Sequence, residues 1–104
     1  MMTEEEKNYI YSMPERIKGH PNYAVTPGGS VVNIKTGKIL KADTSSRGYA
    51  KVDLDGVKVY VHRLVAETFI KNPEGKKYVM HKNGDILDNR FTNLIWSNTF
   101  LPHR

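Results

Sequence analysis

The sequence predicts a small α+β domain, in which several short strands surround one helix. Three observations support this prediction. Glycine and proline residues separate short apolar segments in the first half of the chain, residues 49–61 alternate between apolar and polar side chains, and residues 61–70 change to the spacing of a helix. The 104 residues are enough for one compact unit with a modest core.

Composition narrows the range of partners and chemistries. The chain has 16 Lys and Arg against 11 Asp and Glu, a formal net charge of +5, which suits a polyanion such as nucleic acid and is equally compatible with solubility alone. It has no cysteine, which excludes disulfides, zinc-cysteine sites and thiol nucleophiles. No apolar run approaches the roughly 20 residues of a membrane span, and the acidic N-terminus does not resemble a signal peptide. We therefore expect a cytoplasmic protein with no membrane partner.

The first segment, residues 1–13, is compatible with either a short helix or a loose arm. Thr3 and Glu6 have the spacing of a capping box at the start of a helix. Pro14 follows the segment and would stop a helix there.

Residues 14–60 are predicted to be rich in β-strands. The predicted strands of its first part are the short apolar stretches at 23–25, 30–34 and 38–40. The clearest signal follows at residues 49–61, where two alternating runs flank Asp55-Gly56. Both of these residues tolerate the positive φ that a type I′ turn requires, so we predict a β-hairpin.

The apolar spacing changes to that of a helix after residue 61. The residues that recur at i, i+3, i+4 and i+8 are Val61, Leu64, Val65 and Phe69. They share one face of a helix predicted over residues 63–70, and Pro73 cannot continue it. The predicted core consists of Val25, Val32, Ile39, Val52, Leu54, Val59, Leu64, Val65, Phe69, Leu94 and Trp96.

The last part of the chain is predicted to form strands at 78–81 and 94–96, joined by a polar loop with a tight Asn-Gly-Asp turn at 83–85. The many Asn and Asp side chains of this loop are expected to satisfy its own hydrogen bonds. His81 differs, because it ends a strand beside an exposed turn and several carboxylates. A histidine in such a place can act as a general base near neutral pH.

The order of residues in this loop resembles the HNH endonuclease motif, in the subtype common in small phage and intron-borne homing nucleases. The run reads His81-x-Asn83-Gly84-Asp85-x-x-Asp88-Asn89-x-x-x-Asn93-Leu94-x-Trp96. Residues 61–69, Val-His-Arg-Leu-Val-Ala-Glu-Thr-Phe, are similar to the helix that precedes that motif. Residues 17–40 resemble the nuclease-associated modular DNA-binding motif that is often fused before it. The three motifs occur in the expected order.

The resemblance implies a ββα-metal endonuclease, in which two strands and a helix hold one divalent ion, Mg²⁺ or another hard cation. It implies that His81 is the general base that activates water for attack on a DNA phosphodiester, and that Asn93 steadies the loop around this histidine. It also implies a division of one compact unit into a DNA-binding module at 14–60 and an HNH-like motif at 61–104.

Two positions depart from the family's pattern. The residue before the histidine, which in many members helps to hold the metal, is Met80, whose thioether is a poor ligand for a hard cation. The position of the second ligand falls on Pro102, beside His103, so we expect a truncated closing helix. The remaining candidate metal ligands are Asp85, Asp88 and His103.

Basic side chains are the candidate DNA contacts. Those on or beside the small sheet are Lys35, Lys38, Lys41, Arg47 and Lys51, and those around the histidine are Arg63, Lys82 and Arg90. Family members usually carry an arginine between the glycine and valine of the second strand, where this chain has Gly29-Ser30-Val31.

Two functions remain open from the sequence. The first is a metal-dependent DNA endonuclease, encoded by a phage and acting in the cytoplasm of its bacterial host. The alternative is a catalytically degenerate HNH-fold protein that acts as a nucleic-acid-binding regulator, or as an inhibitor of a host nuclease with which it associates. A homodimer, in which a second protomer supplies the closing helix, is a further possibility.

Overall fold

The computed structural model describes residues 13–44 and 48–99, and its α+β architecture confirms the predicted fold class. In chain order the elements are β1 (Glu15–Ile17), β2 (His20–Val25), β3 (Val31–Asn33), β4 (Lys51–Leu54), β5 (Val57–Tyr60), α2 (Val61–Phe69), β6 (Tyr78–His81), the 3₁₀ turn η1 (Phe91–Asn93) and β7 (Leu94–Ser97). Apart from Met13, the arm or helix expected at 1–13 lies outside the described residues, as does most of the expected closing helix after residue 99.

The N-terminal sheet is antiparallel, with strand order β1-β2-β3. The predicted strands at 23–25 and 30–34 correspond to β2 and β3, whereas β1 was not predicted. The third predicted strand, at 38–40, is wrong, because only Ile39 pairs, in an isolated bridge with Val32. The intervening chain forms a turn in which the Asn33 side chain accepts hydrogen bonds from two following backbone amides, and beyond Leu40 the chain leaves the sheet.

The central hairpin has the predicted turn. Strands β4 and β5 pair antiparallel from Lys51↔Tyr60 to Leu54↔Val57. Asp55 has φ +56° and Gly56 has φ +91°, as a type I′ turn requires. The Asp53 carboxylate accepts a hydrogen bond from the Gly56 amide at 2.6 Å, which further fixes the turn.

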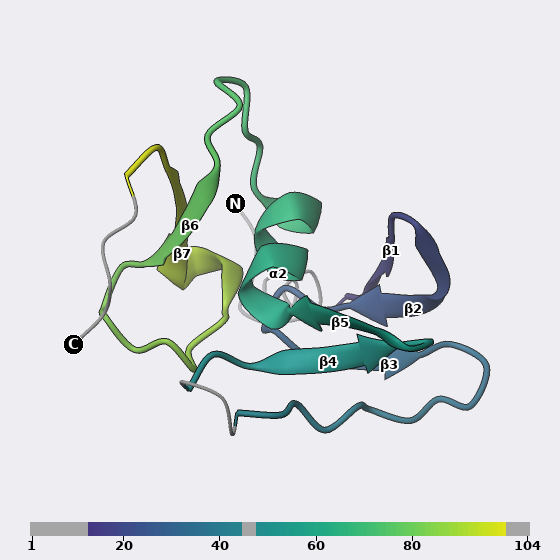
Figure 1. The fold of residues 1–104 in the computed structure, drawn as a ribbon. Helices are drawn as coiled ribbons and strands as arrows, with labels where there is room; N and C mark the ends of the chain where they lie inside the picture. The colour runs from purple at the N-terminus through teal and green to yellow at the C-terminus, as the bar shows by residue number, and fades with distance from the viewer. Residues whose placement is uncertain (1–12, 45–47, 100–104) are drawn as a thin grey trace, which may run out of the picture.

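Helix α2 begins directly after β5, two residues earlier than predicted, because the Val61 amide donates to the Ala50 carbonyl at 2.9 Å and joins the helix to the base of the hairpin. In Figure 1 the helix lies at the centre of the molecule, with the β4–β5 hairpin beneath it, the β6–β7 hairpin on one side and the N-terminal sheet on the other. No helix within the described residues is long and apolar enough to cross a membrane.

The core forms where α2 meets these sheets. Seven of the predicted core residues are buried, namely Val25, Val52, Leu54, Leu64, Val65, Leu94 and Trp96, while Val59 and Phe69 are partly buried against them. The prediction was wrong for Ile39, which is 70% exposed, and for Val32, which is only half-buried. Successive side chains of a strand point to opposite faces, so Val31 is buried instead of Val32, and Ile39 shares the outer face of its bridge partner.

The β6–β7 hairpin completes the fold and carries the polar loop. Its register runs from Tyr78↔Ser97 to His81↔Leu94. The Trp96 indole donates to the Ile70 carbonyl at 3.0 Å, which ties β7 to the end of α2. The Arg63 guanidinium lies over the same indole, 5.2 Å from its centroid. These contacts hold the hairpin against the helix and place the end of β6 beside the first turn of α2.

Candidate functional site

His81 is the last residue of β6, and its side chain points toward the helix. The residue is 3% exposed, and its Nε2 lies 2.7 Å from Oδ1 of Asn89. Because an amide oxygen only accepts hydrogen bonds, Nε2 carries the ring proton and donates a hydrogen bond to Oδ1 of Asn89. The basic lone pair of the neutral ring is then on Nδ1. The structure thus selects one tautomer of this imidazole.

Two other aromatic side chains, His62 and Tyr49, lie beside the His81 ring. The ring centroid of His62, in the first turn of α2, is 5.3 Å away, and that of Tyr49 is 6.2 Å away. His62 is buried as well and contacts Tyr49 at 5.3 Å between centroids. Sequence reasoning missed His62, because it follows directly after Val61 and is off the predicted apolar stripe. Its burial results from the early start of α2 at the end of the hairpin.

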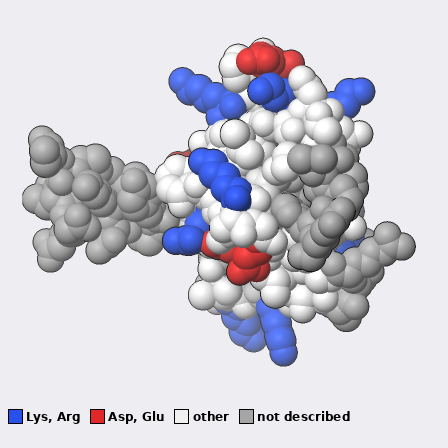
Figure 2. All heavy atoms as spheres, turned by 90° about the vertical axis from the view of Figure 1, so that its left-hand side faces the viewer, with Lys and Arg blue, Asp and Glu red and all other residues white. Residues whose placement is uncertain are grey.

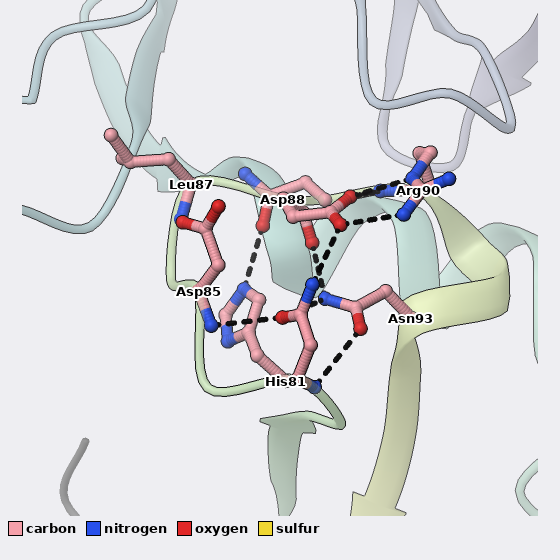
Figure 3. A network of polar contacts seen from close by, with 8 residues as sticks. His81, Asp85, Leu87, Asp88, Arg90 and Asn93 are labelled. Atoms are coloured by element: carbon pink, nitrogen blue, oxygen red, sulfur yellow. Dashed lines mark hydrogen bonds and ion pairs between the residues drawn. The ribbon is translucent and has the colours of Figure 1, made fainter.

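Asn93 holds the two ends of the polar loop together. Its Oδ1 accepts a hydrogen bond from the Asn83 amide at 3.1 Å, and its Nδ2 donates to Oδ1 of Asn83 at 3.0 Å and to the Asp88 carbonyl at 2.9 Å. The Lys82 amide also donates to the Asn93 carbonyl at 2.7 Å. Figure 3 shows this network, with the Asn93 side chain pointing into the loop from the right of His81.

The carboxylates of the loop also bind loop atoms. Asp85 accepts a hydrogen bond from the Leu87 amide at 3.0 Å. Asp88 accepts two from the Arg90 guanidinium, at 2.8 and 2.7 Å, in the fork geometry that arginine favours. Chiefly through these bonds, Arg90 lowers the pKa of Asp88 from its ordinary value of 3.8 to about 2. Asn83 donates a further bond to Asp88 at 3.0 Å.

The described residues do not fit a hard divalent cation. Within residues 13–44 and 48–99, no group of three His, Cys, Asp or Glu side chains is close enough together to hold a metal ion. The Asp88 carboxylate is neutralised by Arg90 rather than directed toward His81. Met80 alternates with His81 along β6 and therefore lies on the opposite face of the hairpin. The third candidate ligand, His103, lies outside the described residues.

The candidate DNA contacts fall into two groups. In the first group are lysines: Lys35, Lys38, Lys41 and Lys82 are exposed, and Lys51 is half-buried in β4. Arg63 and Arg90 instead make protein contacts, since Arg63 donates to the Lys77 carbonyl at 2.6 Å and Arg90 binds Asp88. Arg47 lies outside the described residues. Figure 2 shows that Lys and Arg on the face of the β6–β7 hairpin lie in separate places rather than in one patch.

The fold and the asparagine-held loop after β6 define the class of this protein: it belongs to the HNH endonuclease family. The family model described as HNH endonuclease matches residues 59–99, from the end of β5 to just beyond β7. This result confirms the resemblance to the HNH endonuclease motif in this part of the sequence. HNH endonucleases are in general dependent on divalent metals.

Two relatives of this chain come from viruses. The chain is 48% identical over 87 residues to the uncharacterized HNH endonuclease L247 of Acanthamoeba polyphaga mimivirus, covering 77% of this chain and 22% of that protein. It is 40% identical over 85 residues to the DNA endonuclease I-HmuI of Bacillus phage SP01, covering 77% of this chain and 49% of that protein. The chain therefore spans about a quarter to a half of the length of these relatives.

A solved structure has the same fold. It concerns DNA binding and cleavage by the HNH homing endonuclease I-HmuI. It matches this chain with a TM-score of 0.73 and 38% sequence identity. The match covers 82% of this chain and 52% of that one. It therefore extends beyond residues 59–99 into the N-terminal part of the fold.

Proposed function

We propose that this protein binds DNA and hydrolyses its phosphodiester bonds, with His81 as the general base. The observation that supports this most is the 2.7 Å bond from His81 to Asn89, because it fixes the ring and leaves the lone pair on Nδ1. In the reaction, Nδ1 takes a proton from water as the water oxygen bonds to phosphorus and the bond from phosphorus to the leaving oxygen breaks. Asn93 contributes by holding the loop that carries Asn89.

DNA binding in this proposal depends on exposed lysines rather than on the arginines. Lys35, Lys38 and Lys41 follow the N-terminal sheet, and Lys82 directly follows His81. Lysines in such positions neutralise backbone phosphates and place the duplex without reading its bases. The relative I-HmuI is a DNA endonuclease, and the match to its structure covers 82% of this chain, more than residues 59–99 alone. Affinity should therefore fall steeply as the salt concentration rises.

The test is nicking of supercoiled plasmid in Mg²⁺ and, separately, in Mn²⁺. Several cations are needed because the family depends on divalent metals, whereas the described residues do not select one. His81→Ala should reduce the nicking rate by about 10²–10⁴-fold, the usual contribution of a general base. His20→Ala, on β2 and outside the loop, is the matched control and should nick at the rate of the original protein. A folded His81→Ala variant that nicks at the original rate would refute the role of His81.

A second candidate is a DNA-binding regulator that does not cleave, or an inhibitor that associates with a host nuclease. The observation that favours it is the pairing of Asp88 with Arg90, together with Met80 in place of a hard ligand. This candidate predicts salt-sensitive binding to DNA that survives His81→Ala, with no nicking in any metal.

The possible homodimer has a separate test. In sedimentation at increasing protein concentration, a dimer should approach twice the mass of the monomer.

A further inference from the structure

The turn between β2 and β3, residues 26–30, packs directly on the loop that contains Asn89. A Cβ atom placed on Gly29 would lie 3.1 Å from both the Cβ and the carbonyl oxygen of Asn89. Two residues further along, the Phe91 amide donates to the Pro27 carbonyl at 2.8 Å. The turn therefore contacts the loop at two neighbouring points and sets the position of the segment between them.

Three hydrogen bonds close the turn between β2 and β3. The Thr26 amide donates to the Ser30 carbonyl at 2.8 Å, and the Gly29 amide donates to the Thr26 carbonyl at 3.0 Å. The Thr26 hydroxyl accepts a third bond from the Ser30 amide at 3.0 Å. Because these bonds close the turn on itself, they hold Gly29 in place against Asn89.

Only glycine suits this position. Gly29 has φ +96°, a conformation that L-residues avoid, and a Cβ atom here would lie closer to Asn89 than ordinary van der Waals contact. An added methyl group must move Asn89 by a few tenths of an ångström, since its nearest neighbours include backbone atoms. Asn89 is buried, so such a shift is transmitted to its side chain and to the short bond with His81.

We propose that Gly29 is a positioning residue for His81, acting through Asn89, and that the N-terminal sheet thereby sets the tautomer and orientation of the imidazole. The consequence for hydrolysis rests on the function proposed above, but the effect on the ring does not. The β2–β3 turn lies in the part of the chain expected to bind DNA. A chain of direct contacts, from Gly29 through Asn89 to His81, thus joins that part of the protein to the proposed general base.

The test compares two alanine variants with the same backbone penalty. Gly29→Ala and Gly19→Ala both place alanine at positive φ, +96° and +85°, but a Cβ at Gly19 meets nothing within 4 Å. Imidazole ¹⁵N NMR of the full chain reports the tautomer of each histidine, and His81→Ala assigns the resonance. We expect the Nε2–H tautomer of His81 to dominate in the original protein and in Gly19→Ala, and to give way to a mixture in Gly29→Ala.

Identical His81 spectra for the two alanine variants would overturn the proposal. If Gly29→Ala does not fold, Thr26→Val replaces the hydroxyl that closes the turn with a methyl group of similar size. Loss of this hydrogen bond loosens the turn that packs on Asn89, so the variant should shift the tautomer in the same direction. An unchanged spectrum in that variant also contradicts the proposal.

Nicking separates this inference from the proposed function. If the protein nicks DNA, Gly29→Ala should slow nicking about tenfold with no change in DNA affinity, because displacement of a reacting group lowers the rate of the chemical step. If the protein does not nick DNA but the tautomer responds as described, the proposed function fails and the positioning role stands.

Discussion

Asn93 should contribute more to stability than any other polar side chain of the loop. Asn93→Ala removes three hydrogen bonds, from the Asn83 amide and to the Asn83 side chain and the Asp88 carbonyl. Asn93 is 6% exposed, so water cannot readily replace it. At a net value of about 0.5–1.5 kcal/mol for each bond, the expected loss in the free energy of unfolding is about 2–4 kcal/mol.

A loss of this size is easy to measure. For a domain of this length it lowers the thermal midpoint by about 10–25 °C, and urea titration at low temperature gives the free energy directly. Asn93→Asp separates the bonds, because it keeps the acceptor for the Asn83 amide but turns both donated bonds into contacts between oxygen atoms. It should be at least as destabilising as the alanine variant.

The matched control is Asn98→Ala, since Asn98 is exposed just beyond β7. Its stability should stay within about 0.5 kcal/mol of the original. If Asn93→Ala costs no more than Asn98→Ala, the hydrogen-bond network of Figure 3 does not hold the loop, and the argument that it supports His81 is wrong.

Two further predictions concern the core and the ion pair. Leu54→Ala should lose about 2–5 kcal/mol of stability, because Leu54 is fully buried, while Ile39→Ala should change it by less than about 0.5 kcal/mol; similar urea midpoints for the two would contradict the assigned core. Asp88→Asn should destabilise the protein at pH 7, because Arg90 holds the pKa of Asp88 at about 2, below its ordinary 3.8. This stabilisation is complete above pH 3.8 and is lost as the pH falls to about 2, so the unfolding curves of the variant and the original protein should converge there. A gap between them that persists at low pH would show another cause.

The spacing of apolar residues and the chemistry of turn residues were sufficient to predict several elements of the fold. The β4–β5 hairpin follows from alternation around Asp55-Gly56, and each residue of that turn has the φ that its chemistry predicts. Helix α2 follows from the spacing of Leu64 and Val65, both of which are buried. The prediction failed for Ile39, where a short apolar stretch does not reveal which face of the sheet it joins.

The candidate site was predicted only in part. His81 and Asn93 stand out because of their order within the loop, and Asn93 does bridge backbone groups across it. Asn89 was expected to serve the loop's own hydrogen bonds, but it binds the His81 ring. His62 was not considered at all, because nothing in its local spacing distinguishes it from other polar positions on a helix.

The sequence alone determined the class of fold, the principal turn, the helical face and the membership of a nuclease family, because each depends on residues that lie close together along the chain or on their order. The tertiary structure decided that Asn89 and His62 lie beside the imidazole of His81 and that Gly29 lies against Asn89. Asn89, His62 and Gly29 come from a loop, a helix and a distant turn, and they converge only because α2 packs between the sheets. Such contacts depend on how whole elements pack together, so the spacing of residues within any one element does not predict them.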